Sequence, residues 1–237
     1  MRFDFIYAPV TACLLLIASM LPTSLMAQAP SNTRILIVGD SIMQAVARSL
    51  ERDFAGEKGI EATSFTAIGS GLARMDLFDW HGQIEQRVSS YRPTHAIIMM
   101  GANDNQAMRI NGNTVRMSSQ EWTSEYSRRV GRVMDIMIDG GVRNIYWIEL
   151  PDMRDNRLQR DVQAINDIFR MEADSRPQVQ FKNVRHILSR SPGSYSPYII
   201  QDNGMPLDIR AGDGIHLNRQ GADFLSKHLV PIVLGRR

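Results

Sequence analysis

Short apolar runs alternate along this sequence with helical patterns, and this alternation constrains the fold more than any other feature. Residues 34–38 and 95–100 are two such runs, and each leads into a polar segment that contains glycine. A strand that is apolar at almost every position is buried on both faces, as happens in a parallel sheet covered by helices. We therefore predict an α/β fold, a three-layer α/β/α sandwich with a mainly parallel sheet.

The remaining elements follow from the same kinds of pattern. Further strands are predicted at residues 60–66, 144–150 and 179–184, and a hairpin at 107–117 around Asn111-Gly112. Helices are predicted where apolar residues recur every three to four positions, beginning near residues 42, 122, 158 and 218, with Pro231 kinking or ending the last one. Two long loops are predicted, at 67–82 and 188–212, and the second is expected to help select a ligand because long loops in compact domains are often functional.

The first thirty residues differ from the rest of the chain. An apolar core at residues 8–21 follows a short start, and small residues suited to a signal peptidase stand at Ala27 and Ala29. We therefore predict a signal peptide at residues 1–29 and one domain at residues 30–237. The mature protein is expected to be periplasmic or secreted, without stable insertion in a membrane.

Two alternatives to a cleaved signal peptide are an uncleaved membrane anchor and a lipoprotein. The apolar core is shorter than the about 20 residues that a spanning helix needs, which argues against the anchor. A lipid on Cys13 would require the apolar stretch to precede that residue, but most of it follows. Cys13 is the only cysteine, so cleavage near Ala27 or Ala29 excludes disulfides, thiol catalysis and cysteine-bound metal.

Composition argues against a nucleic-acid partner. The chain has 27 Lys and Arg residues against 25 Asp and Glu residues, a formal net charge of +2, and no basic run. No cofactor or metal is predicted either, because Asp40 and Asp104 are expected to accept hydrogen bonds from loop backbone. The histidines outside the motifs described below are expected to be structural or exposed: His81, His95, His186 and His228.

Ser41 and His216 are the first candidates for chemistry. Ser41 follows the strand at 34–38 and precedes a helix, whose N-terminus favours developing negative charge, although a lone serine there is more typical of a helix cap. Asp213 stands three residues before His216, so its carboxylate can orient one imidazole nitrogen while the other accepts the serine proton. Segments that follow parallel strands meet at one sheet edge, so residues 101–104 are expected near Ser41.

Gly71 and Asn103 would complete such a site. Acyl transfer passes through an oxyanion that needs fixed hydrogen-bond donors, each worth about 10²–10³ in rate. A glycine lets its backbone N–H approach closely, and an asparagine amide is a donor that does not titrate. Taken singly, Gly71 is also consistent with a turn and Asn103 with loop stabilisation, so the set carries more weight than its members.

Four segments resemble the motif blocks of SGNH (GDSL-type) hydrolases, in the order found in that family: residues 39–42 (Gly-Asp-Ser-Ile), 70–72 (Ser-Gly-Leu), 101–104 (Gly-Ala-Asn-Asp) and 213–216 (Asp-Gly-Ile-His). The resemblance covers about residues 34–230 and implies a flavodoxin-like sheet. It implies that Ser41 is the nucleophile, that His216 is the base and that Asp213 orients it. The implied oxyanion hole consists of the backbone of Ser41 and Gly71 and the side chain of Asn103.

Longer matches at residues 70–80, 100–106 and 213–217 resemble the DUF459 group of exported bacterial SGNH proteins. Met75 stands where many of them have proline, which is expected to affect only loop stiffness. The resemblance implies a serine esterase but assigns no substrate. Export into a bacterial envelope favours O-acyl esters of acetyl type, with an envelope glycan or a small molecule as substrate. The alternatives are an O-acyltransferase to a glycan, a lysophospholipase or thioesterase, and a non-catalytic carbohydrate-binding protein. The sequence assigns no substrate-binding residue.

Overall fold

The structure is a computed structural model that describes Met1, residues 32–189, Ser191 and residues 193–236. Residues from Asn32 onward form one compact unit. Apart from Met1, the predicted signal peptide at residues 1–29 lies outside the described residues. In the part of the chain that is described, no helix is both long enough and apolar enough to cross a membrane.

A five-stranded parallel sheet forms the centre of this unit, and its order is β2-β1-β3-β6-β7. Its strands are β1 (Thr33–Gly39), β2 (Ile60–Thr66), β3 (His95–Met99), β6 (Asn144–Ile148) and β7 (Val179–Lys182). The predicted α/β fold is therefore confirmed. The strand order reverses between β1 and β3, and ligands of such sheets bind beyond the carboxyl ends of the strands at this point.

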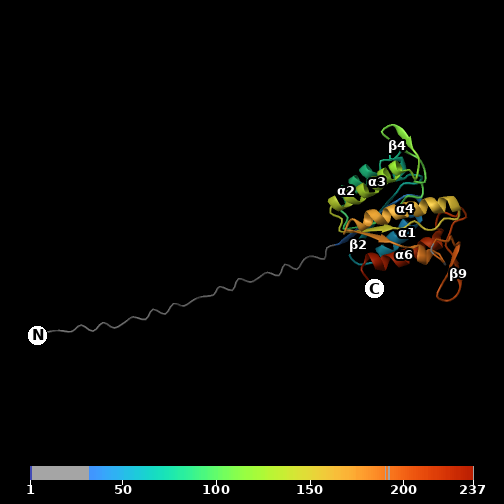
Figure 1. Cartoon of the computed structure of the whole chain (residues 1–237). Helices are drawn as coiled ribbons and strands as arrows, with labels where there is room; N and C mark the ends of the chain where they lie inside the picture. Colours follow the sequence, from blue (N-terminus) through green and yellow to red (C-terminus); the bar gives the residue numbers. More distant parts are fainter. Residues whose placement is uncertain (2–31, 190, 192, 237) are drawn as a thin grey trace. The chain divides into compact units, whose positions relative to one another are not determined.

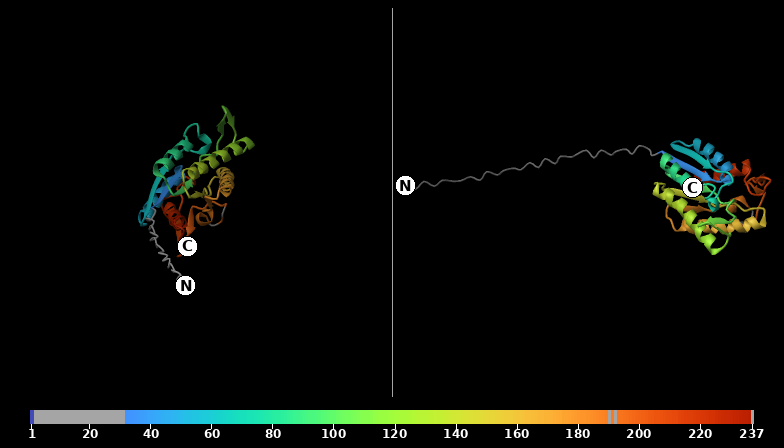
Figure 2. Two further views of the ribbon diagram at one scale, coloured as in Figure 1. Left: turned by 90° about the vertical axis from the view of Figure 1, so that its left-hand side faces the viewer. Right: turned by 90° about the horizontal axis from the view of Figure 1, so that it is seen from above.

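Helices cover both faces of the sheet and complete three layers (Figures 1 and 2). They are α1 (Ser41–Ala55), α2 (Trp80–Tyr91), α3 (Gln120–Asp139), α4 (Asn156–Asp174), α5 (Arg185–Leu188) and α6 (Arg219–Val233), with a 3₁₀ turn η1 (Leu72–Arg74). The helices α2, α3 and α4 pack side by side on one face, and α1 packs against α6 on the other. Because all five strands are parallel, the chain leaves each strand at the same carboxyl edge of the sheet before it reaches the next helix.

The core lies between these layers. Residues 35–38 of β1 and 96–100 in and after β3 are almost fully buried, as expected for strands covered on both faces. Trp80, Trp122 and Trp147 are among the largest fully buried side chains. Trp122, near which one of the predicted helices begins, is therefore a core residue, and burial of such aromatic surface stabilises the fold by the hydrophobic effect.

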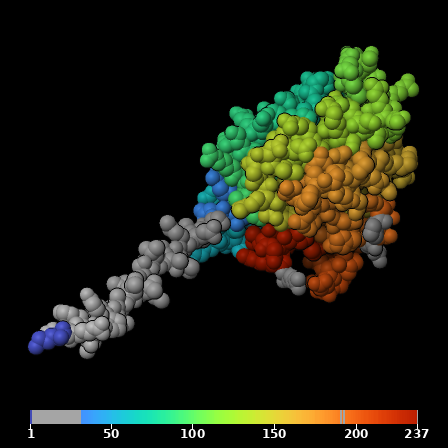
Figure 3. Space-filling model, turned by 60° about the vertical axis from the view of Figure 1, so that its left-hand side comes forward, coloured from blue at the N-terminus to red at the C-terminus, as the bar shows by residue number. Residues whose placement is uncertain are grey.

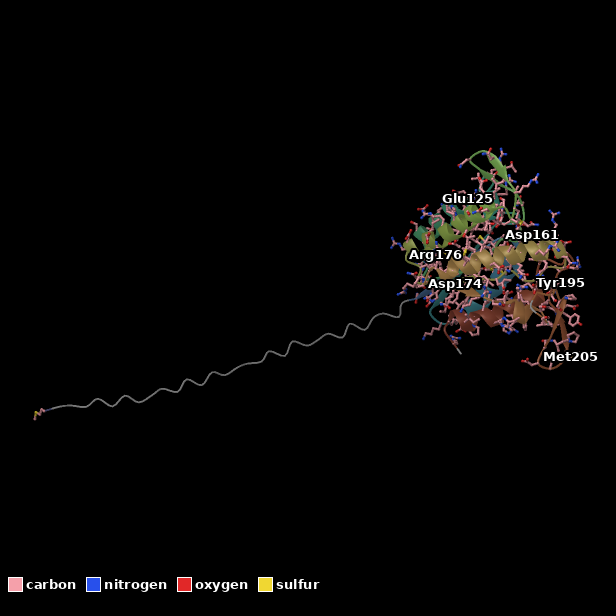
Figure 4. All side chains as sticks on the ribbon, in the orientation of Figure 1. Glu125, Asp161, Asp174, Arg176, Tyr195 and Met205 are labelled. Carbon is pink, nitrogen blue, oxygen red and sulfur yellow. The ribbon has the colours of Figure 1, made fainter. Side chains whose placement is uncertain are left out.

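Two antiparallel hairpins project from the domain beside the sheet (Figure 1). One consists of β4 (Met108–Ile110) and β5 (Asn113–Val115), and Asn111-Gly112 forms its turn as predicted, with φ of 48° and 82°. The other consists of β8 (Tyr198–Ile200) and β9 (Pro206–Asp208), and its atoms protrude from the surface in the space-filling view (Figure 3). Met205 marks the outer end of this second hairpin (Figure 4).

The second hairpin corrects the prediction that residues 188–212 are a loop without regular structure. Its turn contains Asn203-Gly204, the same hairpin signal as at residues 111–112, and Gly204 has a φ of 80°. The backbone N–H of Gln201 donates to the Met205 carbonyl at 3.0 Å and closes the turn. The signal was present in the sequence but was hidden by the polar residues around it.

Three smaller corrections concern the ends of elements. The predicted loop at 67–82 contains η1, and α2 already begins at Trp80 because the Asp79 side chain accepts from the Gly82 N–H and caps the helix. The strands predicted at 144–150 and 179–184 each end two residues earlier. Pro231 lies inside the last turn of α6, which continues to Val233.

Candidate active site

Ser41 occupies the first position of α1, directly after β1. Asp40 caps this helix, because its Oδ1 accepts a hydrogen bond of 2.9 Å from the Ile42 N–H. The turn is tight enough to require glycine before it, since a Cβ on Gly39 would lie 2.1 Å from the Met99 carbonyl oxygen. This turn fixes the Ser41 hydroxyl at the carboxyl edge of the sheet, with its backbone N–H in the first turn of the helix, where amides have no helical partner.

His216 links Ser41 to Asp213. Its Nε2 lies 2.8 Å from Ser41 Oγ, and its Nδ1 lies 2.6 Å from Asp213 Oδ2. Partial burial raises the pKa of Asp213, but the hydrogen bonds from the His216 side chain and from the backbone amides of Ile215 and His216 outweigh it and lower the pKa to about 2. Asp213 is therefore ionised at neutral pH and is held in one orientation toward the imidazole.

Arg154 braces the turn that carries Asp213. Its backbone N–H donates to the Gly214 carbonyl at 3.0 Å, and its Nη2 donates to the Gly212 carbonyl at 2.8 Å, one residue on either side of Asp213. The Arg154 side chain also lies directly over Gly214, where a Cβ would approach it to 2.6 Å. The backbone of this turn is thus fastened to the segment that follows β6.

Asp40 connects the start of α1 to the segment that follows β3. Its Oδ2 accepts from the Gly101 N–H at 2.8 Å while its Oδ1 caps the helix, so the predicted role of bonding loop backbone is confirmed. The side chain is completely buried. Burial raises its pKa to about 6, and the backbone hydrogen bonds only partly oppose this shift.

Asp104 connects the segment that follows β3 to the turn after β2. Its carboxylate accepts from the backbone N–H of Leu72 at 3.1 Å and of Ala73 at 2.7 Å, and from the Tyr126 hydroxyl at 2.7 Å. Burial raises the pKa of Asp104 to about 7. Gly71 is buried against it, and a Cβ there would lie 2.1 Å from Asp104 Oδ1. Close approach, rather than an unusual φ, therefore requires glycine at this position.

Arg129 holds the backbone carbonyl groups of Leu72 and Ala73, the two residues whose N–H groups bond to Asp104. Its Nη1 donates to the carbonyls of Leu72 at 2.7 Å and Ala73 at 3.1 Å, and Glu125 holds its Nε at 2.7 Å. Tyr126 and Arg129 both lie on the helix predicted to begin near residue 122, but the apolar periodicity that predicts this helix assigns neither of them a role at the site. The signal that indicates such a role is a pair of polar side chains on a buried helix face, since both need partners there.

Asn103 reaches the residue before Gly71. Its Nδ2 donates to the Ser70 carbonyl at 2.9 Å, and the second hydrogen of the amide is left to serve another acceptor. Ser70 is held in turn, because its hydroxyl accepts from Trp80 Nε1 at 3.1 Å and donates to the Ala67 carbonyl at 2.6 Å. The side-chain amide of Asn103, predicted to be an oxyanion donor, is thus fixed beside residues 70–73, which we call the glycine segment.

The structure therefore distributes the predicted residues over segments that share the carboxyl edge of the sheet. Ser41 follows β1, Gly71 follows β2, Asn103 follows β3, and Asp213 and His216 precede α6. Ser41, His216 and Asp213 are in direct hydrogen-bond contact, whereas Gly71 and Asn103 are joined to this edge through the two buried aspartates. The arrangement can take a proton from a serine hydroxyl and offer several N–H groups to an oxyanion.

The hydrogen-bond contacts of His81, His95, His186 and His228 are with groups other than Ser41, His216 and Asp213. His81 Nε2 contacts the Arg129 carbonyl at 3.0 Å, and His228 Nδ1 contacts the Phe224 carbonyl at 2.8 Å. Among the residues that the structure describes, no three His, Cys, Asp or Glu side chains are grouped so that they could hold a metal ion.

Most of the domain matches one known family. A family model described as "Protein of unknown function (DUF459)" matches residues 34–231. The chain belongs to the DUF459 family. The resemblance to the DUF459 group found in the sequence is thereby confirmed.

Solved structures similar to this DUF459 protein share its fold. One from Streptococcus pneumonia, named for platelet activating factor, has a TM-score of 0.54 and 17% identity, and the match covers 88% of this chain and 86% of that one. The lipase Lip_vut3 from the goat rumen metagenome has a TM-score of 0.52 and 12% identity, with 84% and 96% covered. Such low identities establish the α/β fold alone. No curated protein sequence matches the chain.

Proposed function

We propose that this protein is an exported serine esterase that removes short acyl groups, of acetyl type, from glycans of the cell envelope. The observation that carries the proposal is the series Asp213–His216–Ser41, with separations of 2.6 Å and 2.8 Å at the carboxyl edge of the sheet. A serine hydroxyl is a weak nucleophile until a base takes its proton. Here the base already contacts the hydroxyl, and a carboxylate already orients the base.

The proposed reaction proceeds through an acyl-enzyme. Ser41 Oγ attacks the ester carbonyl carbon while its proton moves to Nε2 of His216. When the tetrahedral intermediate collapses, the bond to the alcohol oxygen breaks and the alcohol leaves with that proton. Water then attacks the acyl group on Ser41 with His216 again as the base, and the free acid is released. Asp213 stabilises the imidazolium in both halves of the reaction.

The proposed oxyanion hole uses donors from three segments. The N–H of Ser41 lies in the first turn of α1, the N–H of Gly71 lies on the segment held by Asp104 and Arg129, and Asn103 offers its side-chain amide. Donors that are fixed before the reaction need no reorganisation when charge develops on the carbonyl oxygen. The buried supports of the glycine segment therefore favour acyl transfer over a merely structural use of these residues.

A glycan ester is consistent with the openness of the site. The side chain of His216 is 34% exposed and that of Asp213 is 45% exposed, so a bulky alcohol group can remain partly in solvent. One structural neighbour is a lipase, an enzyme of ester bonds on this fold. The apolar segment at residues 8–21 and the small residues Ala27 and Ala29 support export.

The first test is the identity of the nucleophile. The wild-type protein should react with a fluorophosphonate at Ser41, found by mass spectrometry, and should hydrolyse p-nitrophenyl acetate. Ser41→Ala should lose both reactions by at least about a thousandfold, as expected for loss of the nucleophile of a triad. Ser90→Ala is the matched control, because Ser90 is an exposed serine on α2. Full activity of Ser41→Ala would refute the mechanism.

Product analysis then separates hydrolysis from the alternatives. With an acetylated oligosaccharide and a free glycan acceptor present, the proposal predicts free acetate. An acylated acceptor would instead identify a transferase, and preference for long-chain lipid or thioester substrates would identify a lysophospholipase or thioesterase. Saturable glycan binding by a protein that is unreactive toward the fluorophosphonate would identify a binding protein. Each of the last three results would contradict the proposal.

A further inference from the structure

An arginine-lined hollow lies between α1, which begins at Ser41, and α6, which begins three residues after His216. Its volume is about 430 Å³, and its lining includes Arg48 and Arg52 from α1 and Arg219 from α6. We call it the arginine groove. None of these arginines has a part in the proposed esterase reaction, so the groove needs a separate explanation.

The arginines of α1 lie on the same face of that helix as the proposed nucleophile. Relative to Ser41, Ala45, Arg48 and Arg52 are at positions i+4, i+7 and i+11, which is the spacing of side chains that stand above one another on a helix. At 1.5 Å per residue, Arg48 lies about 10 Å and Arg52 about 16 Å from Ser41 along the helix axis. The groove therefore leads away from the reacting hydroxyl along α1.

The opposite wall begins next to the proposed base. Arg219 is the first residue of α6 and follows His216 by three positions. The two helices pack against each other, so Arg219 faces the beginning of α1 across the groove. Arg219 and the Ser41–His216 pair thus lie at the same end of this helix pair, and the groove extends from there toward Arg52 in the last turn of α1.

Small side chains leave the space between these walls open. Ala45 stands between Ser41 and Arg48 on the α1 face, and Ala222 lines the groove from α6. The surface between the reacting hydroxyl and the first arginine is consequently formed by a methyl group rather than by a long side chain. A substituent of a substrate bound at Ser41 has room to extend toward Arg48.

The three arginines differ in whether they form a close ion pair. Arg52 is engaged, since its Nη2 lies 3.0 Å from Asp223 Oδ1 and 3.0 Å from Asp53 Oδ1. Asp223 is engaged too, because the Ser49 hydroxyl donates to it at 2.6 Å, and these bonds lower its pKa.

Arg48 and Arg219 differ from Arg52 in this respect. Both are exposed, and neither forms an ion pair within the part of the chain that the structure describes. The groove therefore presents two free guanidinium groups to whatever lies in it.

We propose that the arginine groove binds an anionic substituent, a carboxylate or a phosphate, of an O-acylated glycan whose ester lies at Ser41. The inference rests on the proposed esterase function and gives its substrate a charge. A guanidinium group forms paired hydrogen bonds with both carboxylate and phosphate oxygens, and its charge does not depend on pH in the physiological range. The reacting ester itself is neutral, so only the remote substituent reaches the arginines. The groove therefore acts on substrate binding, so loss of its arginines should change KM more than kcat.

The test compares acetylated oligomers of equal length that differ in charge. Acetylated oligogalacturonate carries carboxylates, an acetylated glycerol phosphate oligomer carries phosphates, and acetylated chitooligosaccharide is neutral. The wild-type protein should prefer at least one anionic ester over the neutral one by about tenfold in kcat/KM. Raising NaCl from about 50 mM to about 500 mM should reduce this preference, since salt screens exposed charges.

Variants locate the preference in the groove. In Arg48→Gln/Arg219→Gln the ratio of anionic to neutral kcat/KM should fall about tenfold through a higher KM, and the salt dependence should disappear. Arg143→Gln/Arg160→Gln is the matched control, because it removes the same net charge from exposed arginines before β6 and on α4. An equal fall in the control, or no preference in the wild-type protein, would overturn the inference.

A binding measurement separates this inference from the proposed function. Unacylated oligogalacturonate and glycerol phosphate oligomers are titrated calorimetrically into the Ser41→Ala protein, with and without the two groove substitutions. Binding that requires Arg48 and Arg219 supports the groove even if the wild-type protein hydrolyses no ester. Hydrolysis of the neutral ester without any groove-dependent binding or preference would refute the groove and leave the esterase proposal standing.

Discussion

The Tyr126 hydroxyl donates a hydrogen bond of 2.7 Å to Asp104 Oδ2, and neither side chain is accessible to solvent. Asp104 uses its carboxylate to hold the backbone N–H groups of Leu72 and Ala73, directly after Gly71. Helix α3 thereby contributes to the position of the glycine segment without touching the proposed reacting atoms. We regard Tyr126 as a positioning residue of the site.

Tyr126→Phe removes this hydrogen bond and keeps the ring. The bond favours the charged carboxylate, so its loss should raise the pKa of Asp104 from its value of about 7 and weaken the hydrogen bonds that Asp104 accepts from residues 72 and 73. We expect kcat at pH 7 to fall about three- to tenfold, the pH at which kcat is half-maximal to rise, and stability to drop by about 1–2 kcal/mol. Activity-versus-pH profiles and urea unfolding measure these effects.

The control for this variant is Tyr91→Phe. The Tyr91 hydroxyl donates to the Glu61 carbonyl at 3.0 Å, at the opposite end of α2 from the site. It should leave the pH profile of kcat in place. A loss of stability in Tyr126→Phe without any change in that profile would show that Tyr126 acts on folding alone.

Gly71→Ala tests the close approach at the glycine segment. The new Cβ would lie 2.1 Å from Asp104 Oδ1, so either the carboxylate or the backbone of the segment must move. Because a displacement of the proposed N–H donor removes an oxyanion contact, we expect kcat for p-nitrophenyl acetate to fall about a hundredfold or more. In the control Gly56→Ala the nearest atom would be at an ordinary 3.5 Å, and kcat should be unaffected. Full activity of Gly71→Ala would exclude its N–H from the oxyanion hole.

The buried aspartates make stability depend on pH. The pKa is about 6 for Asp40 and about 7 for Asp104, whereas an aspartate in the unfolded chain has a pKa of about 4. Between these values the folded protein keeps protons that the unfolded chain releases. Stability should therefore fall as pH rises from about 4 to 7, by up to about 1.4 kcal/mol per pH unit for each group. Asp104→Asn removes one of these titrations, so the stability that it loses relative to wild type should be smaller at pH 8 than at pH 5.

Unfolding by urea at a series of pH values measures this difference. Asp76→Asn serves as the control, since the hydrogen bond from Arg74 holds the pKa of Asp76 below its usual range and its charge does not change between pH 5 and 8. A difference between wild type and Asp104→Asn that stays constant over this range would mean that Asp104 is ionised throughout.

The edge of the sheet that carries the candidate site could be predicted from the sequence. Parallel strands all end at one edge, so the residues after 34–38 and after 95–100 had to share it, and Ser41 and Asn103 do. The spacing of Asp213 and His216 likewise allows one side chain to reach the other within a single turn. Each of these relationships depends on where a residue stands relative to its own strand or turn, and the parallel sheet brings the strand ends together.

The support beneath the glycine segment could not be predicted in the same way. Periodicity shows that the face of α3 with Tyr126 and Arg129 is buried, but not which loop its polar atoms reach. That depends on the distance between α3 and the turn after β2, which tertiary packing sets. The arginine groove depends on the packing of α1 against α6 for the same reason, although the spacing of Ser41, Arg48 and Arg52 is visible in the sequence.

The β8–β9 hairpin gives a test of substrate selection beyond the charge of the substrate. Ile200 and Met205, on the strand and turn of this hairpin, are 49% and 61% exposed, and the hairpin leads directly into the turn with Asp213. Replacing residues 201–205 by Asn-Gly would shorten the turn and keep the bond from the Ile209 N–H to the Pro197 carbonyl at the base of the hairpin. We expect kcat/KM for acetylated oligosaccharides to change at least about threefold while turnover of p-nitrophenyl acetate changes less than about twofold. Equal losses on both substrates would show that the hairpin supports the fold of the Asp213 turn and does not select the substrate.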